Sequence, residues 1–168
     1  MPAARRRRAP VLRLVVETRL GSGLTTRELR ARLAKMMVAL KLDDAELSVL
    51  LTGDDQIREL NKLYRKKDRP TDVLAFAMRE GTTIRTAQQP ELLGDVIVSI
   101  PTARAQAQRA RRTPLAEVTM LLAHGLLHLL GWDHDTPAKD RAMRAETDRL
   151  CAAAGASQPN EARRRKLH

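Results

Sequence analysis

Three of the four histidines in this 168-residue sequence lie within one short segment, His124-Gly-Leu-Leu-His128-Leu-Leu-Gly131-Trp-Asp-His134. Two histidines four positions apart lie on the same face of a helix, one turn apart. Both imidazoles can then reach one tetrahedral zinc ion at about 2.0–2.1 Å. We therefore interpret His124 and His128 as two ligands of a zinc ion.

The third histidine, His134, cannot reach the same ion if the helix simply continues. Gly131 can adopt the left-handed conformation that ends a helix and turns the chain back, which lets His134 approach from a second direction. Three imidazoles leave a fourth position for water, as in catalytic zinc sites, and zinc lowers the pKa of that water to about 7. The segment predicts a hydrolytic zinc centre, although nickel or another divalent ion also suits three imidazoles.

The spacing is similar to the long zinc motif of the metzincin peptidases, H-E-x-x-H-x-x-G-x-x-H. Gly125 stands where those peptidases place a glutamate general base, and a general base commonly contributes about 10²- to 10⁴-fold to the rate. We interpret the glycine as leaving space beside the metal. A metallopeptidase-like hydrolase remains an alternative, but it needs a base from outside this motif.

The periodicity of apolar residues predicts a mixture of strands and helices without strict alternation. The segment 115–130 is apolar nearly all round, which is typical of a helix central to a core. We expect an α+β, single-domain, zincin-like fold with a small mixed β-sheet packed against helices. Thr25 with Glu28 predicts a capped helix start, and Asp54 is predicted to cap the next helix. The predicted strands are 11–17, 47–52, 73–77 and 92–100, the predicted helices are 25–40, 54–64, 101–111, 115–130 and 137–153, and 81–90 is a predicted loop.

The composition is that of a globular protein with a strongly basic balance. Hydrophobic residues make up 43% and charged residues 30%, and the net charge is +11. Part of that charge lies in residues 1–9, a predicted basic arm, and in 155–168, a predicted basic tail, around a catalytic zinc domain at 10–154. Such arms attract polyanions or only aid solubility. Aromatic residues make up only 2%, so platforms for stacking RNA bases are scarce: Tyr64, Phe76 and Trp132 are the whole supply.

Cys151 is the single cysteine, which rules out an intramolecular disulfide, and its Ala-rich surroundings favour a small buried side chain. Residues 11–16 are too few and too charged for a signal peptide, and no apolar window is long enough to span a bilayer. We therefore expect a reduced, cytoplasmic protein without a membrane partner.

Residues 47–150 resemble the YbeY endoribonucleases, also called rRNA maturation factors. The histidine segment carries the resemblance most specifically. Three further segments stand in the right order: Glu59-Leu-Asn-Lys-Leu-Tyr-Arg-Lys-Lys-Asp68, Pro70-Thr-Asp-Val-Leu-Ala-Phe76 and Leu93-Gly-Asp-Val-Ile-Val-Ser99. Two departures are Trp132, where the family usually has Tyr, and Ala75, where Ser is usual.

The resemblance implies a zinc-dependent endoribonuclease, specific for single strands, that processes the 3′ end of small-subunit rRNA and serves ribosome quality control. The implied partners are rRNA, other single-stranded RNA and the small ribosomal subunit. The family's zinc ligands correspond to His124, His128 and His134, and its functional arginine corresponds to Arg65. The predicted catalytic residues are Arg65 and His124. The remaining alternative is a ribosome biogenesis factor that uses zinc only to stabilise its fold.

From the residues alone, Arg65 has two interpretations: a guanidinium that grips a phosphate with two hydrogen bonds, or a solvated helix end. Likewise, Lys66, Lys67 and Arg69 either follow an RNA backbone or are ordinary surface charge. In our mechanistic hypothesis, RNA lies between the Arg65 region and the histidine helix, and the attacking group is a metal-activated water or the RNA 2′-hydroxyl.

Asp133 and Asp135 flank the third histidine in the sequence. Either carboxylate can accept the distal N–H of a zinc-bound imidazole, or it can cap a helix or form a turn. Asp72 and Asp95 are interpreted as turn or sheet-end residues without a chemical role.

Overall fold

Four strands and five helices form within residues 9–42, 44–78 and 91–155, which the computed structural model describes. The predicted loop 81–90 and nearly all of both predicted basic arms lie outside the described residues. The α+β class and the mixed sheet are confirmed. In chain order the elements are β1 (Val11–Val16), α1 (Thr26–Ala39), β2 (Ala45–Thr52), α2 (Asp54–Arg65), β3 (Val73–Ala77), β4 (Glu91–Ser99), α3 (Ile100–Ala110), α4 (Pro114–Leu129) and α5 (Pro137–Ala153).

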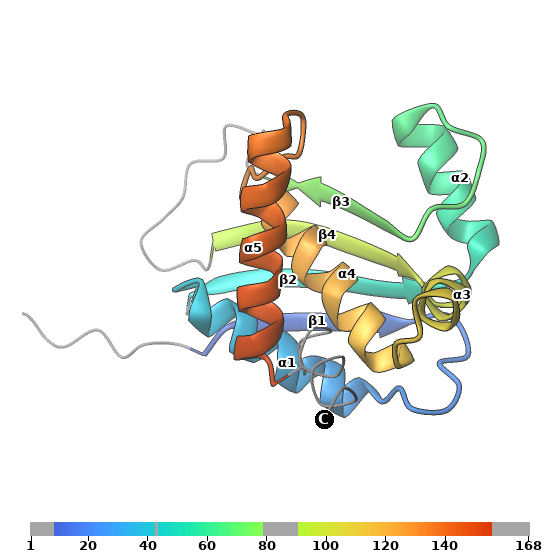
Figure 1. Cartoon of the computed structure of the whole chain (residues 1–168). Coiled ribbons are helices and arrows are strands. Elements are labelled where there is room, and N and C mark those ends of the chain that lie inside the picture. The colour runs from blue at the N-terminus through green and yellow to red at the C-terminus, as the bar shows by residue number, and fades with distance from the viewer. Residues whose placement is uncertain (1–8, 43, 79–90, 156–168) are drawn as a thin grey trace, which may run out of the picture.

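The sheet has the strand order β1-β2-β4-β3. β1, β2 and β4 run parallel, whereas β3 pairs with β4 in the antiparallel direction and forms one edge of the sheet. In Figure 1 this edge strand lies between α4 and the C-terminal end of α2. The edge strand therefore lies beside the helix that carries two of the three clustered histidines.

Gly94 allows β3 and β4 to approach closely at an irregularity of the sheet. Its φ is +134°, and a Cβ atom there would lie 2.1 Å from the carbonyl oxygen of Phe76. The carbonyl of Phe76 thus faces β4. Because successive carbonyls of a strand point in opposite directions, the carbonyl of Ala75 faces the free edge of the sheet.

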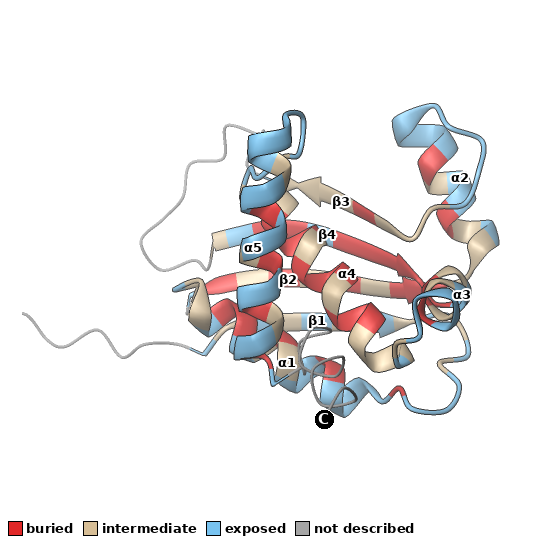
Figure 2. Cartoon of the chain, viewed as in Figure 1, coloured by how far each residue is buried: buried red, intermediate tan, exposed pale blue. Residues whose placement is uncertain are grey.

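The helices form two unequal layers around the sheet. α1 and α4 pack on one face, and α5 packs against both of them. Figure 2 shows buried residues concentrated in α4, β4 and β2. The opposite face carries a smaller cluster, in which Ile57 of α2 packs with Leu74 and Ile97. α4 alone contributes ten buried residues, and this packing holds its histidine face at the edge of the core.

Hydrogen bonds at the helix starts test the capping predictions. The Thr25 hydroxyl accepts from the Glu28 N–H at 3.2 Å, as predicted. The prediction for α2 was wrong, because Gly53 is its N-cap. The Asp54 carboxylate instead accepts hydrogen bonds from Ser99 Oγ at 2.5 Å and Thr102 Oγ1 at 2.6 Å, which ties α2 to the start of α3.

Element boundaries shifted by one or two residues from the predicted ones, apart from β3 and α5, which match. None of the helices in the described ranges combines the length and the apolar character needed to cross a bilayer.

Candidate metal centre

His124 and His128 lie in the last two turns of α4, a helix with a well-defined start. Thr113 is its N-cap and accepts a hydrogen bond from Ala116 N–H at 3.1 Å, and Pro114 occupies the first turn. Both features favour a helix that begins at Pro114. The two imidazoles are half-buried, whereas neighbouring residues of the helix are buried in the core.

Gly131 ends the histidine helix in the conformation that the sequence predicted. Its φ is +93°, and no neighbouring atom would contact an added Cβ. The Gly131 N–H donates to the His128 carbonyl at 3.0 Å, and the Trp132 N–H donates to the Leu127 carbonyl at 3.1 Å. This pair of bonds is a Schellman motif. Position 131 therefore requires glycine because of its backbone conformation, and not because a side chain would clash with a neighbour.

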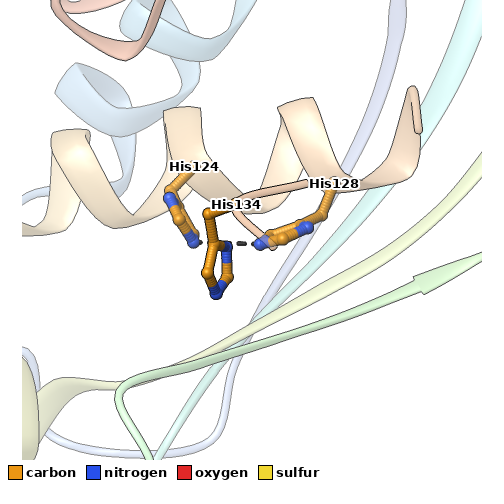
Figure 3. Close-up of side chains that lie close together, drawn as sticks. All are labelled: His124, His128 and His134. Carbon is orange, nitrogen blue, oxygen red and sulfur yellow. Dashed lines mark hydrogen bonds between the residues drawn. The ribbon is translucent and has the colours of Figure 1, made fainter. Parts of the chain in front are cut away.

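The turn brings all three imidazoles to one point, as Figure 3 shows. The Nε2 atoms of His124 and His128 are 3.0 Å apart. Each residue can offer one ring nitrogen such that the three lie within 4.8 Å of one another. Tetrahedral coordination at 2.0–2.1 Å requires nitrogen separations of about 3.3 Å. The three histidines can thus hold one metal ion after small side-chain movements.

Burial favours the neutral form of the two helical histidines. The pKa of His124 is lowered, mainly by desolvation and then by the charges of His128 and His134. The pKa of His128 is lowered by desolvation and then by His134, with a smaller contribution from Arg65. Neutral imidazole is the form that binds metal ions. The lowered pKa values and the geometry of the histidines therefore both favour metal binding.

A groove of about 640 Å³ opens from the histidines along the edge strand. His128 and His134 line the groove, and so does Arg65, the last residue of α2. The exposed Arg65 guanidinium donates from Nη2 to the Ala75 carbonyl at 2.8 Å. Its Cζ atom lies 5.1 Å from the centre of the Phe76 ring. The structure thus places Arg65 and two of the three histidines on the same groove.

Two further cations, Lys67 and Arg69, line the groove on the loop that follows α2. Asn61, buried on α2, holds this loop by donating from Nδ2 to the Arg69 carbonyl at 2.9 Å. The Asp68 carboxylate accepts from Arg58 Nε at 2.8 Å. Lys66 does not line the groove but forms the C-cap of α2 in a left-handed conformation.

The contacts of the acidic residues favour their structural interpretations. Asp133 accepts from the Asp135 N–H at 3.3 Å and from Lys139 Nζ at 3.4 Å, and these contacts, the Asp135 bond first, lower its pKa. Asp72 accepts from the Val73 N–H at 2.8 Å and from Gln106 Nε2 at 3.2 Å. The carboxylates of Asp133 and Asp72 therefore stabilise the turns beside the site.

Asn61 and the Tyr64–Phe76 contact were missed by sequence reasoning. A polar residue four positions after buried Ile57 was the available signal for Asn61. No sequence signal indicated that Tyr64 of α2 would meet Phe76 of β3. Cys151 is only partly buried, and desolvation raises the pKa of its thiol to about 11, so it adds no reactive group.

The interpretation of Gly125 as space beside the metal was wrong. Gly125 is buried against the sheet, where an added Cβ would lie 2.6 Å from Val96 Cγ1 and 3.4 Å from Val73 Cγ2. Only a glycine lets α4 pack this closely on the edge of the sheet.

We expect Gly125→Ala to destabilise the protein by about 1 kcal/mol, because overpacking costs about 1–3 kcal/mol and exceeds the gain of about 1 kcal/mol in helix propensity. Chemical denaturation measures this change. Adding Val96→Ala makes room for the new methyl group, so the double variant should lose less stability than the sum of the two single variants. An alanine variant more stable than the wild type would show that the helix does not pack this tightly.

Comparisons with known proteins agree with this site. Residues 20–155 match the family model described as "Endoribonuclease YbeY". A protein named "Endoribonuclease YbeY" from Anaeromyxobacter sp. (strain Fw109-5) is 46% identical over 129 residues, which is 77% of this chain and 65% of the relative. A protein of the same name from Sulfurihydrogenibium sp. (strain YO3AOP1) is 46% identical over 117 residues, covering 70% of this chain and 74% of the relative.

The chain thus spans just under two thirds of the length of the Anaeromyxobacter relative. A solution structure of a Thermotoga maritima protein covers 89% of this chain and 98% of its own, with a TM-score of 0.55 and 24% identity, and it shows the similarity of fold alone. The family model covers the strands β2 to β4, Arg65 and all three clustered histidines. The chain belongs to the endoribonuclease YbeY family.

Proposed function

We propose that this protein is a zinc-dependent endoribonuclease that cleaves single-stranded RNA in a cytoplasmic rRNA maturation step, at the 3′ end of small-subunit rRNA, and in ribosome quality control. His124, His128 and His134 hold the zinc ion, Arg65 and His124 act in catalysis, and the small ribosomal subunit is the partner. The family name supports the reaction, and the zincin-like arrangement of the fold is part of the same proposal.

One observation carries this proposal: three imidazoles converge, and two of them, those of His128 and His134, line a groove that Arg65, Lys67 and Arg69 also line. Three nitrogen ligands leave one position of a tetrahedral ion open. Three cations along the same groove suit the phosphates of a strand that passes the histidines. A purely structural zinc site closes its coordination sphere and needs no such groove.

The chain's own residues position the scissile phosphate. The hydrogen bond from Arg65 to the Ala75 carbonyl holds the guanidinium at the edge of β3 and leaves its other N–H groups for phosphate oxygens. A guanidinium there counters the negative charge that develops on the phosphate in the transition state. A bound zinc ion supplies a Lewis acid and lowers the pKa of a bound water.

Two nucleophiles are compatible with this arrangement, and the product ends distinguish them. Attack by the RNA 2′-hydroxyl leaves a 2′,3′-cyclic phosphate and a 5′-hydroxyl. Attack by water can instead leave a 5′-phosphate and a free 3′-hydroxyl. Products with these ends would exclude attack by the 2′-hydroxyl. Mass spectrometry of the fragments identifies the ends.

Two features of the structure disfavour a peptidase function. The Ala75 carbonyl, which faces the free edge where an extended peptide would pair, already accepts from Arg65. The position of the peptidase glutamate is Gly125, which faces the sheet rather than the metal ligands. The chain therefore lacks both the open edge and the base at these positions.

Removal of the metal tests the proposed function. We expect the purified protein to cleave a single-stranded RNA, to stop when a chelator removes the metal, and to recover when zinc is restored. Gel electrophoresis of labelled RNA measures this, and a fully paired RNA of the same sequence and a casein substrate serve as controls. Cleavage that persists after the metal content falls to zero would contradict the proposal.

A further inference from the structure

Tyr64 and Phe76, two of the three Phe, Tyr and Trp residues in the sequence, contact each other beside the candidate metal centre. The ring centres of Tyr64 and Phe76 are 5.1 Å apart, with an angle of 59° between the ring planes. Phe76 lines the groove together with His128 and His134. Tyr64 and Arg65 are consecutive, so one helix end presents a ring and a guanidinium to the same phenylalanine.

The packing of the fold does not account for the exposure of Tyr64. Along one face of α2, Ile57 is fully buried, Leu60 is half-buried and Tyr64 is 60% exposed. In Figure 1 the far end of α2 projects beyond the edge strand β3. Large rings tend to be buried in a core or an interface. An exposed ring that contacts Phe76, a residue of the groove wall, is therefore suited to a ligand.

The charges around the rings indicate which ligand. Arg65, Lys67 and Arg69 line the same groove, so its occupant carries phosphates. A ring adjacent to phosphate-binding cations matches the two surfaces of a nucleotide, a charged backbone and a flat base. A phosphorylated peptide offers no flat surface at each step of its chain.

We propose that Tyr64 and Phe76 form a stacking platform for one unpaired base of the RNA strand, next to the phosphate that Arg65 holds. The proposal rests on the proposed function and deepens it, because it assigns the preference for single strands to two residues. In a duplex both faces of an interior base are covered by its neighbours. An unpaired base has a free face, so only a single strand gains the stacking contact.

Binding of RNAs that lack one base tests the platform. A short fluorescent single-stranded RNA is compared with versions carrying one abasic nucleotide at successive positions. Stopped-flow anisotropy of the zinc-loaded protein measures affinity before cleavage, and the same samples then give the cleavage rate. For the wild type we expect one abasic position to weaken binding by about 5- to 150-fold, the usual contribution of one base–aromatic stack.

Tyr64→Leu should bind the intact RNA more weakly by a similar factor and should lose the penalty at that abasic position. Phe76→Leu keeps an apolar side chain in its small cluster with Ile57 and should behave in the same way. Leu63→Ala is the matched control, because Leu63 is the adjacent residue and is 70% exposed. We expect this variant to keep both the affinity and the abasic penalty.

The possible outcomes separate this proposal from the proposed function. If both leucine variants keep the wild-type affinity and the full abasic penalty while RNA is cleaved, the platform is wrong and the endoribonuclease function stands. If the variants lose the penalty but no RNA is cleaved with zinc bound, the platform stands and the proposed reaction fails. A folded Phe76→Leu variant, checked by circular dichroism, ensures that a loss of binding is not a loss of structure.

Discussion

His128→Ala should leave the protein without its metal ion and without RNA cleavage. We expect the zinc content to fall from about one ion per chain to near zero, because two imidazoles hold zinc far more weakly than three. Metal binding also stabilises the fold, by about 2.7 kcal/mol at a free zinc concentration of 100 times Kd. For a domain of this size that corresponds to roughly 5–11 °C in Tm. Plasma mass spectrometry and thermal unfolding with and without zinc measure both effects.

The fourth histidine of the sequence provides the matched control. His168 lies outside the described residues and outside the clustered segment, so His168→Ala should retain zinc, the Tm increase and cleavage. His128→Ala should unfold at about the temperature of chelated wild-type protein and should not respond to added zinc. Full zinc content in His128→Ala would remove this residue from the ligand set.

Arg65→Ala should abolish most RNA cleavage while the metal and the fold are retained. Arg65 is exposed, and the contacts described for it are one hydrogen bond to the Ala75 carbonyl and the approach of its guanidinium to the Phe76 ring, so its removal should cost little stability. Loss of one positioned donor to a developing negative charge commonly costs about 10²- to 10³-fold in kcat. We expect a loss of this size in single-turnover cleavage, with zinc content and Tm close to those of the wild type.

Arg65→Lys distinguishes charge from geometry at this position. Lysine keeps the positive charge but cannot make two parallel hydrogen bonds to a phosphate, so we expect only partial recovery. Arg144→Ala is the control for general charge loss, because Arg144 is exposed on α5 and pairs only with Asp140 among the contacts described for it. Unchanged cleavage by Arg65→Ala would exclude this residue from the mechanism.

The convergence of the three histidines was largely predictable because its geometry is local. A four-residue spacing on a helix and one glycine at its end determine where three imidazoles lie, and these features are visible along a short stretch of chain. The confirmed turn at Gly131 follows from this local rule. The α+β class followed in the same way from the periodicity of apolar residues.

Contacts between distant segments were not predictable from the sequence. The space beside Gly125 depends on which strand packs under α4, and that strand is β4, nearly thirty residues earlier. The Asp54 carboxylate does not cap its own helix, because it accepts hydrogen bonds from Ser99, the last residue of β4, and from Thr102 of α3. The meeting of Tyr64 with Phe76 likewise requires the antiparallel edge strand.

X-ray absorption spectroscopy of the zinc-loaded protein tests the central claim most directly. We predict that the zinc is bound by three imidazole nitrogens from the protein at about 2.0–2.1 Å and by one exchangeable oxygen ligand. Addition of a phosphate or a short RNA should alter only the oxygen ligand. A zinc ion bound by four protein side chains, or by fewer than three imidazoles, would contradict the account.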